Sequence, residues 1–165
     1  MFLWTPKMIK TQVIDNWLEK DLINFLHTFF LHLAPHFFSQ RSHSEDENNY
    51  FYISKLNTYD PFSLYLSSKL EKFFKKNILI DDIYANIQHP NMEGSFHYDK
   101  CDVTCLLMVS ESLKEKGQFI IKDEEIIEFV QNRLIIFDSK KLHKGVAPVK
   151  GARISLAFKI NFQKD

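Results

Sequence analysis

The sequence predicts an α+β fold in which N-terminal helices pack on one sheet of an antiparallel β-sandwich. In residues 1–77 apolar side chains recur every three or four positions, which is typical of helices with one buried face. In residues 78–163 they alternate with polar side chains, which is typical of half-buried strands. Residues 1–165 contain no linker-like segment, so we expect a single domain: a mainly helical cover followed by a β core.

Two helices are expected in the first part of the chain. Asp15 is placed to cap the first helix, and Pro35 ends it. Asp60 and Pro61 suit the cap and the first position of the second helix. The predicted apolar faces comprise Leu18, Leu22, Leu26, Phe29 and Leu33 in the first helix and Phe62, Leu66, Leu70 and Phe73 in the second.

The remaining segments are expected to be loops and short strands. The polar residues 39–49 indicate a mobile surface loop, and a short strand is expected at residues 50–53. Later strands are predicted near residues 83–88, 103–109, 134–137 and 153–160, with hairpin turns at 123–124 and 131–132. In the last strand Arg153, Ser155, Ala157 and Lys159 share the polar face. Closely spaced short strands imply an antiparallel sandwich or barrel.

Composition excludes several classes of function. Formal net charge is zero and there is no basic stripe, so a nucleic-acid partner is not expected. No apolar run approaches the ~20 residues of a membrane span, so no membrane role is expected. Only two cysteines, Cys101 and Cys105, are present, which favours a reducing compartment and a cytoplasmic location.

Three residues form a candidate metal site. His97 and Asp99 are two positions apart, so on a strand both side chains would point to the same side. Sheet pairing can bring His143 alongside them. Two imidazoles and one carboxylate on one face leave open positions on an octahedral metal, which suits non-haem Fe(II). The His97–Asp99 pair alone is equally compatible with a polar turn containing a hydrogen-bonded histidine.

Arg153 strengthens this interpretation. It follows His143 by ten residues and lies on the polar side of the last predicted strand. An arginine that faces the interior of a sandwich needs an anionic partner, because a buried unpaired charge is costly. A carboxylate of a cosubstrate suits the guanidinium, and Ser155 on the same face can add a hydroxyl.

These residues resemble the 2-oxoglutarate/Fe(II)-dependent dioxygenase superfamily, and most closely its prolyl 4-hydroxylase-like branch, which includes small proteins carried by phages. The matching positions are Tyr84, Asn86, Gln88, Gly94, His97, Asp99, Val103, Thr104, Cys105, Arg133, Phe137, Asp138, His143, Arg153 and Ser155. The resemblance implies a double-stranded β-helix, a jelly-roll and cupin-like fold, within which the N-terminal helices pack on one sheet.

The resemblance also implies a role for each matching site residue. His97, Asp99 and His143 would hold Fe(II), and Arg153 would bind the distal carboxylate of the cosubstrate 2-oxoglutarate. Further expected contacts to 2-oxoglutarate are Tyr84, Asn86, Thr104 and Ser155. The implied activity is hydroxylation with O2, releasing succinate and CO2, with ascorbate as a supporting reductant.

The chain departs from the family pattern in three places. Met108 stands where some relatives have a tyrosine, so one hydroxyl expected near the cosubstrate is missing. Lys116-Gly117-Gln118 replaces a Gly-Gly pair. Lys159 lies six residues after Arg153 and is interpreted as a surface lysine at the end of a strand, with a second anion contact as the alternative.

Several substrates and one rival function remain open. A prolyl or other residue in a protein or peptide is expected first, and a small free metabolite second, with residues 39–49 and 90–96 flanking the entrance. The rival is a cupin-like metal-binding protein without oxygenase activity, which would not need Arg153. His89 is interpreted as a loop residue rather than a metal ligand.

Overall fold

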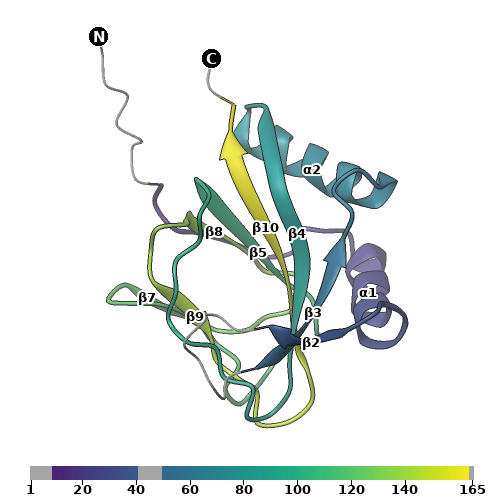
Figure 1. The fold of residues 1–165 in the computed structure, drawn as a ribbon, viewed down its shortest axis with the longest axis vertical. Helices are drawn as coiled ribbons and strands as arrows, with labels where there is room; N and C mark the ends of the chain where they lie inside the picture. The colour runs from purple at the N-terminus through teal and green to yellow at the C-terminus, as the bar shows by residue number, and fades with distance from the viewer. Residues whose placement is uncertain (1–8, 41–49, 164–165) are drawn as a thin grey trace.

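The computed structural model describes residues 9–40 and 50–163, which form two antiparallel sheets and two α-helices (Figure 1). The larger sheet has the order β1 (Gln12–Ile14), β8 (Leu134–Asp138), β5 (Val103–Met108), β10 (Arg153–Phe162), β4 (Ile78–Gln88), β3 (Phe51–Leu56) and β2 (Phe37–Gln40). The smaller sheet has the order β7 (Glu125–Ile127), β6 (Phe119–Ile121) and β9 (His143–Gly145). The sheets face each other, and residues of both line one cavity.

Strand β10 is a central strand of the larger sheet and is buried on both of its faces. It pairs with β4 on one side and with β5 on the other, so its side chains alternate between the two faces of the sheet. The apolar face, which carries Ile154, Leu156, Phe158 and Ile160, belongs to the main core. The opposite face, which carries Arg153, Ser155, Ala157 and Lys159, lines the cavity. The alternation predicted from the sequence is confirmed, and its polar side points into the interior.

Two helices cover the outer face of the larger sheet. Helix α1 (Lys20–Thr28) continues into a π-helical turn at Phe29–Leu33, and α2 (Pro61–Phe74) lies beside β4 (Figure 1). The side chains that join the main core are Ile23, Leu26, Phe30, Leu66 and Leu70. Within residues 9–40 and 50–163 no helix is both long and apolar enough to cross a membrane.

The sequence predicted the second helix correctly and the first only in part. Asp60 caps α2 and accepts a 2.7 Å hydrogen bond from the Ser63 amide, as expected. Asp15, however, does not cap α1: the cap residue is Glu19, and the Asp15 carboxylate binds Arg133 at 2.6 and 2.9 Å. The buried face also differs: Ile23, Leu26 and Phe30, which follow the ordinary helical spacing, are buried. Leu33, predicted on the apolar face, lies at the end of the π turn and is 68% exposed.

Residues before 78 contribute more strands than the sequence predicted. The helical cover expected for residues 1–77 also contains β1, β2 and β3, all of which extend the larger sheet. Ser39 and Gln40, predicted in a loop, belong to β2, and residues 41–49 lie outside the described residues. The strand expected at 50–53 is confirmed as β3. The two strands that the sequence did not predict, β1 and β2, are short edge strands, too short for a period to be recognised.

Asn132 connects the N-terminal segment to the turn before β8. Its side chain accepts a hydrogen bond from the Leu18 amide (2.8 Å) and donates one to the Leu18 carbonyl (2.7 Å), and its own φ is +65°. Asn132→Ala is expected to lower the free energy of unfolding by about 2 kcal/mol, because both bonds are buried and alanine disfavours this φ. Urea unfolding measures the loss. Asn132→Gly accepts the positive φ but lacks the side-chain hydrogen bonds, so it should recover only part of the lost stability. Full recovery would show that the Asn132 side chain does not stabilise the fold.

Candidate metal centre

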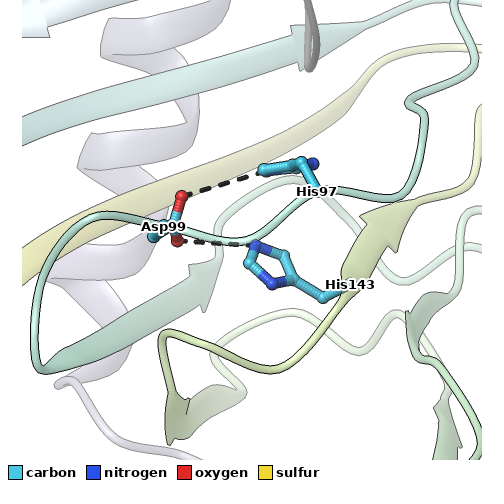
Figure 2. Close-up of side chains that lie close together, drawn as sticks. All are labelled: His97, Asp99 and His143. Atoms are coloured by element: carbon cyan, nitrogen blue, oxygen red, sulfur yellow. Dashed lines mark ion pairs between the residues drawn. The ribbon is translucent and has the colours of Figure 1, made fainter.

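His97, Asp99 and His143 lie together at one position between the two sheets (Figure 2). One ligand atom from each residue lies within 4.8 Å of the other two. His97 Nε2 is 3.9 Å from Asp99 Oδ1, and His143 Nε2 is 3.4 Å from Asp99 Oδ2. In the part of the chain that the structure describes, this is the single group of three such side chains with metal-ligand geometry. The juxtaposition predicted from the sequence is therefore present.

Backbone pairing brings the two histidines side by side. His97 and His143 form an isolated antiparallel β-bridge with N–H···O distances of 3.1 and 2.9 Å. His143 begins β9, whereas His97 lies outside the named strands. Asp99 follows in a loop that is fixed by a 2.8 Å hydrogen bond from its amide to the Ser139 carbonyl. In place of the regular strand expected at residues 97–99 there is a single β-bridge. The side chains of His97, Asp99 and His143 still converge on one position.

Both imidazoles are oriented by carbonyl groups of the backbone. His97 Nδ1 lies 2.9 Å from the Ser95 carbonyl and His143 Nδ1 lies 2.8 Å from the Lys141 carbonyl. A carbonyl only accepts, so each Nδ1 carries the proton and each Nε2 is left as the atom that can bind a metal. Burial, followed by the neighbouring His143, lowers the pKa of His97 below its usual value. The neutral form that binds a metal is therefore favoured.

Asp99 is held as a carboxylate by three polar neighbours. Burial alone would raise its pKa, but the neighbouring imidazole of His143 and the charge of Lys159 hold the pKa of Asp99 well below its usual range. Thr104 donates a 2.6 Å hydrogen bond to Asp99 Oδ2, and Lys159 Nζ contacts the same oxygen. Thr104, expected to contact 2-oxoglutarate, thus lies directly against a candidate metal ligand.

The side chain of Lys159 is largely covered by the protein, and its interpretation as a surface lysine at a strand end was wrong. Its side chain is 13% exposed and forms an ion pair with Asp99. Burial lowers its pKa, but contacts with Tyr84 and Asp99 outweigh this effect and raise the pKa overall, so the amine is protonated. The error arose because β10 continues to Phe162, which leaves Lys159 inside the strand. Its even spacing from Arg153 was the signal that placed it on the cavity face.

The predicted site residues line a single cavity of about 270 Å³ between the sheets. They are Tyr84, Asn86, His97, Asp99, Thr104, His143, Arg153 and Ser155, and Lys159 joins them. The cavity is also lined by Phe119 and Phe137, whose rings lie 5.6 and 4.7 Å from the His143 ring. Metal ligands and cationic groups therefore share one cavity.

Arg153 is a buried cation with one free nitrogen. Its Nε donates to the Gly117 carbonyl (2.8 Å), and its Nη1 donates to Gln88 Oε1 (2.8 Å) and Ser155 Oγ (3.2 Å). Its Nη2 is buried and has no partner among the described residues. Burial lowers the pKa of Arg153 to about 10, so it remains charged at neutral pH. A buried cationic donor of this kind fits an anionic ligand such as the distal carboxylate of 2-oxoglutarate.

Sequence reasoning assigned no role to two residues that position this arginine. Gln88 holds Nη1 with its side-chain oxygen and donates its amide to the Met92 carbonyl at 2.8 Å. Gly145 leaves room for both of these side chains, because a Cβ at this position would lie 2.8 Å from Arg153 Nη1 and 2.9 Å from Gln88 Oε1. The sequence carried a signal for Gln88, which shares its strand face with Tyr84 and Asn86, but none for Gly145.

Gly145→Ala is expected to weaken binding of 2-oxoglutarate by about tenfold or more, because the added methyl displaces the guanidinium from its hydrogen bonds. Calorimetric titration of the metal-loaded variant with 2-oxoglutarate measures the effect. Metal affinity serves as the internal control and should change little. Unaltered 2-oxoglutarate affinity in the variant would show that the position of Arg153 does not matter for this ligand.

Neither His89 nor the two cysteines belong to the group of candidate metal ligands. His89 packs its ring edge-on against Tyr52 at 6.0 Å and is not part of the cluster, as expected. Cys101 and Cys105 are buried free thiols. Burial raises the pKa of both cysteines, which keeps the thiols protonated.

Comparison with known proteins identifies the fold. No protein-family model matches the sequence, and no curated protein matches it significantly. Solved structures do match. An oxidoreductase of the 2OG-Fe(II) oxygenase family from Burkholderia pseudomallei aligns with a TM-score of 0.73 at 10% identity, over 92% of this chain and 84% of that one. The chain has the fold of the 2-oxoglutarate- and Fe(II)-dependent oxygenases.

Two prolyl hydroxylases share this oxygenase fold. A viral collagen prolyl hydroxylase from Paramecium Bursaria Chlorella virus-1, solved as a 2OG complex, aligns with a TM-score of 0.69 at 16% identity, over 91% of this chain and 94% of that one. A prolyl-4-hydroxylase from Pseudomonas putida aligns with a TM-score of 0.67 at 14% identity, over 93% of both chains. The resemblance inferred from the sequence is thus confirmed for the fold.

Proposed function

We propose that the chain is an Fe(II)- and 2-oxoglutarate-dependent oxygenase that hydroxylates its substrate. The observation that carries this proposal is the combination of two features in one cavity. A two-histidine, one-carboxylate group with metal-ligand geometry lies beside Arg153, a buried arginine whose Nη2 has no partner among the described residues. Either feature alone also occurs in proteins of different function; together they match a metal and a carboxylate cosubstrate bound side by side.

We infer that the two sheets form a double-stranded β-helix. The supporting observation is the order of pairing: β8, β5, β10 and β4 are neighbours in the larger sheet, and β7, β6 and β9 in the smaller. The His97–His143 bridge adds a further antiparallel pairing beside β9. When the His97 segment is counted with the smaller sheet, the chain from β4 onward alternates between the two sheets except across the β6–β7 hairpin, as in a jelly roll. We also propose that residues 1–165 form one domain.

In this proposal each polar group of the cavity has a task. His97, Asp99 and His143 would hold Fe(II), and Arg153 would bind the distal carboxylate of 2-oxoglutarate. When bound, the metal and 2-oxoglutarate supply the activation of O2 and release succinate and CO2 as the substrate is hydroxylated, with ascorbate supporting the reduced metal. Gln88 keeps the guanidinium in place, and Thr104 keeps one oxygen of Asp99 oriented. Tyr84, Asn86 and Ser155 line the same cavity and would contact the cosubstrate.

The substrate and cellular setting extend this proposal. A prolyl or other residue in a protein or peptide is favoured by the fold shared with prolyl hydroxylases, and a small free metabolite is the alternative. Tyr98, 60% exposed between the two candidate ligands, lines the cavity and would meet the substrate. Free cysteines favour a reducing, cytoplasmic setting. Zero net charge argues against a nucleic-acid partner.

Binding of Fe(II) and 2-oxoglutarate without O2 tests the proposal directly. Adding 2-oxoglutarate to the anaerobic Fe(II) protein should produce a visible metal-to-ligand charge-transfer band, because the keto acid chelates the metal. His143→Ala should show none, while Lys55→Met, which changes an exposed ion pair outside the cavity, should keep it. A wild-type protein that binds Fe(II) but gives no band would instead indicate a cupin-like metal-binding protein.

A further inference from the structure

We propose that Lys159 binds a carboxylate carried by the substrate that the site oxidises. This inference rests on the proposed function and specifies its substrate class. Lys159 is the second cation inside the cavity, with a side chain that is 13% exposed, and it lies six residues from Arg153 on the same face of β10. The Cα atoms of the two residues are thus roughly 20 Å apart along the strand, and Lys159 lies at the end next to Asp99.

The balance of charge in the cavity is the main argument. Its charged lining residues are Asp99, Lys100, Arg153 and Lys159, and Lys100 is exposed to solvent. A divalent metal and Arg153 together carry three positive charges, which Asp99 and the two carboxylates of 2-oxoglutarate balance. Lys159 then remains as a buried positive charge with no counter-charge. Such a charge is costly unless an anion accompanies it.

Neighbouring groups do not supply that counter-charge. Tyr84 places its ring 5.5 Å from Lys159 Nζ, but burial raises the pKa of its phenol, so it is neutral. Asp82 lies opposite Lys159 in the register of β4 and β10, but its carboxylate pairs with Lys55 at 3.1 Å. Asp99 is the single anion that contacts Lys159 among the described residues, and a bound metal would share its charge.

The position of Lys159 suits a ligand other than 2-oxoglutarate. Arg153 already provides a partner for the distal carboxylate of 2-oxoglutarate, and its other carboxylate would be bound at the metal. The lysine has a flexible stem and three donors, so its ammonium can turn from Asp99 to an incoming carboxylate without moving β10. A substrate that carries a carboxylate near the oxidised position would complete the charge balance, whereas a neutral substrate would leave it incomplete.

Paramagnetic relaxation provides the test, with acetate as the carboxylate probe and acetamide as its neutral match. The protein is loaded with Mn(II) and saturated with 2-oxoglutarate, and broadening of the ¹³C-labelled carboxyl signal of acetate is followed by NMR. Wild-type protein should give saturable broadening by acetate and none by acetamide. In Lys159→Met the dissociation constant for acetate should rise by about tenfold or more, because a charged donor is lost.

Control variants separate charge, folding and the proposed function. Lys159→Arg should retain acetate binding, and Lys72→Met should behave as wild type, since it removes an exposed positive charge on α2, outside the cavity. Binding of 2-oxoglutarate, measured first on every variant, shows that each is folded. If 2-oxoglutarate itself fails to bind wild-type protein, the proposed function is wrong. If 2-oxoglutarate binds but acetate gives no broadening, or the same broadening in Lys159→Met, the assignment of Lys159 is wrong.

Discussion

Asp99→Ala is expected to abolish metal binding and to lower the free energy of unfolding by about 3 kcal/mol. Stability should fall because removing one partner of an ion pair inside the protein leaves the other charge unpaired. The substitution removes the only carboxylate of the candidate triad. It also leaves the ammonium of Lys159 in the cavity without the oxygen that it contacts. Isothermal titration with Co(II) measures the first effect, and urea unfolding of the metal-free protein measures the second.

A double variant separates these two effects. In Asp99→Ala/Lys159→Met the buried charge is gone together with its partner, so much of the lost stability should return. Metal binding should not return, because the third ligand is still missing. Recovery of metal binding in the double variant would show that Asp99 served the charge of Lys159 rather than the metal. Equal instability in the single and double variants would show that the ion pair is not what stabilises this region.

Arg153→Ala is expected to weaken 2-oxoglutarate binding by at least about a hundredfold, which corresponds to losing a buried charge-assisted contact worth about 3 kcal/mol. Metal affinity should change little, since Arg153 contacts none of the three candidate ligands. Titration of the Co(II) protein with 2-oxoglutarate measures the loss. The charge-transfer band of the anaerobic Fe(II) protein should disappear at the same cosubstrate concentration.

Two matched variants show whether the guanidinium acts by charge or by position. Arg153→Lys keeps the charge but loses the hydrogen bonds to Gly117 and Gln88, so its affinity should fall between those of wild type and Arg153→Ala. Gln88→Leu leaves the charge and removes one anchor, and should give a smaller loss. Full 2-oxoglutarate binding by Arg153→Ala would favour the cupin-like alternative, in which this arginine has no ligand.

The sequence was most informative where a single periodicity extends over many residues. The alternation in β10 predicted both of its faces, and the even spacing of Tyr84, Asn86 and Gln88 placed them on the adjacent strand face. The three candidate metal ligands could be predicted from residue type and order, although the His97–His143 bridge that brings them together could not. Such a bridge depends on how a loop meets a distant strand, which local periodicity does not encode.

The remaining differences have the same kind of origin. The helix ends in a π turn that leaves Leu33 exposed, and no residue type marks a π turn in a sequence. The residue type of Asp15 suits a helix cap, whereas its actual partner, Arg133, is 118 residues away. Lysines are usually exposed, which is why the sequence favoured a surface position for Lys159. In each case a tertiary contact outweighed a local preference.

Formation of succinate from 2-oxoglutarate under air is the measurement that tests the central claim most directly. Purified protein with Fe(II) and ascorbate should produce succinate even without its substrate, slowly and in proportion to enzyme. The rate should depend on iron and fall to background in His97→Ala, which removes one candidate ligand while leaving Arg153 and its contacts in place. Absence of turnover in wild-type protein, together with absence of the charge-transfer band, would contradict the assignment of this site as an oxygenase.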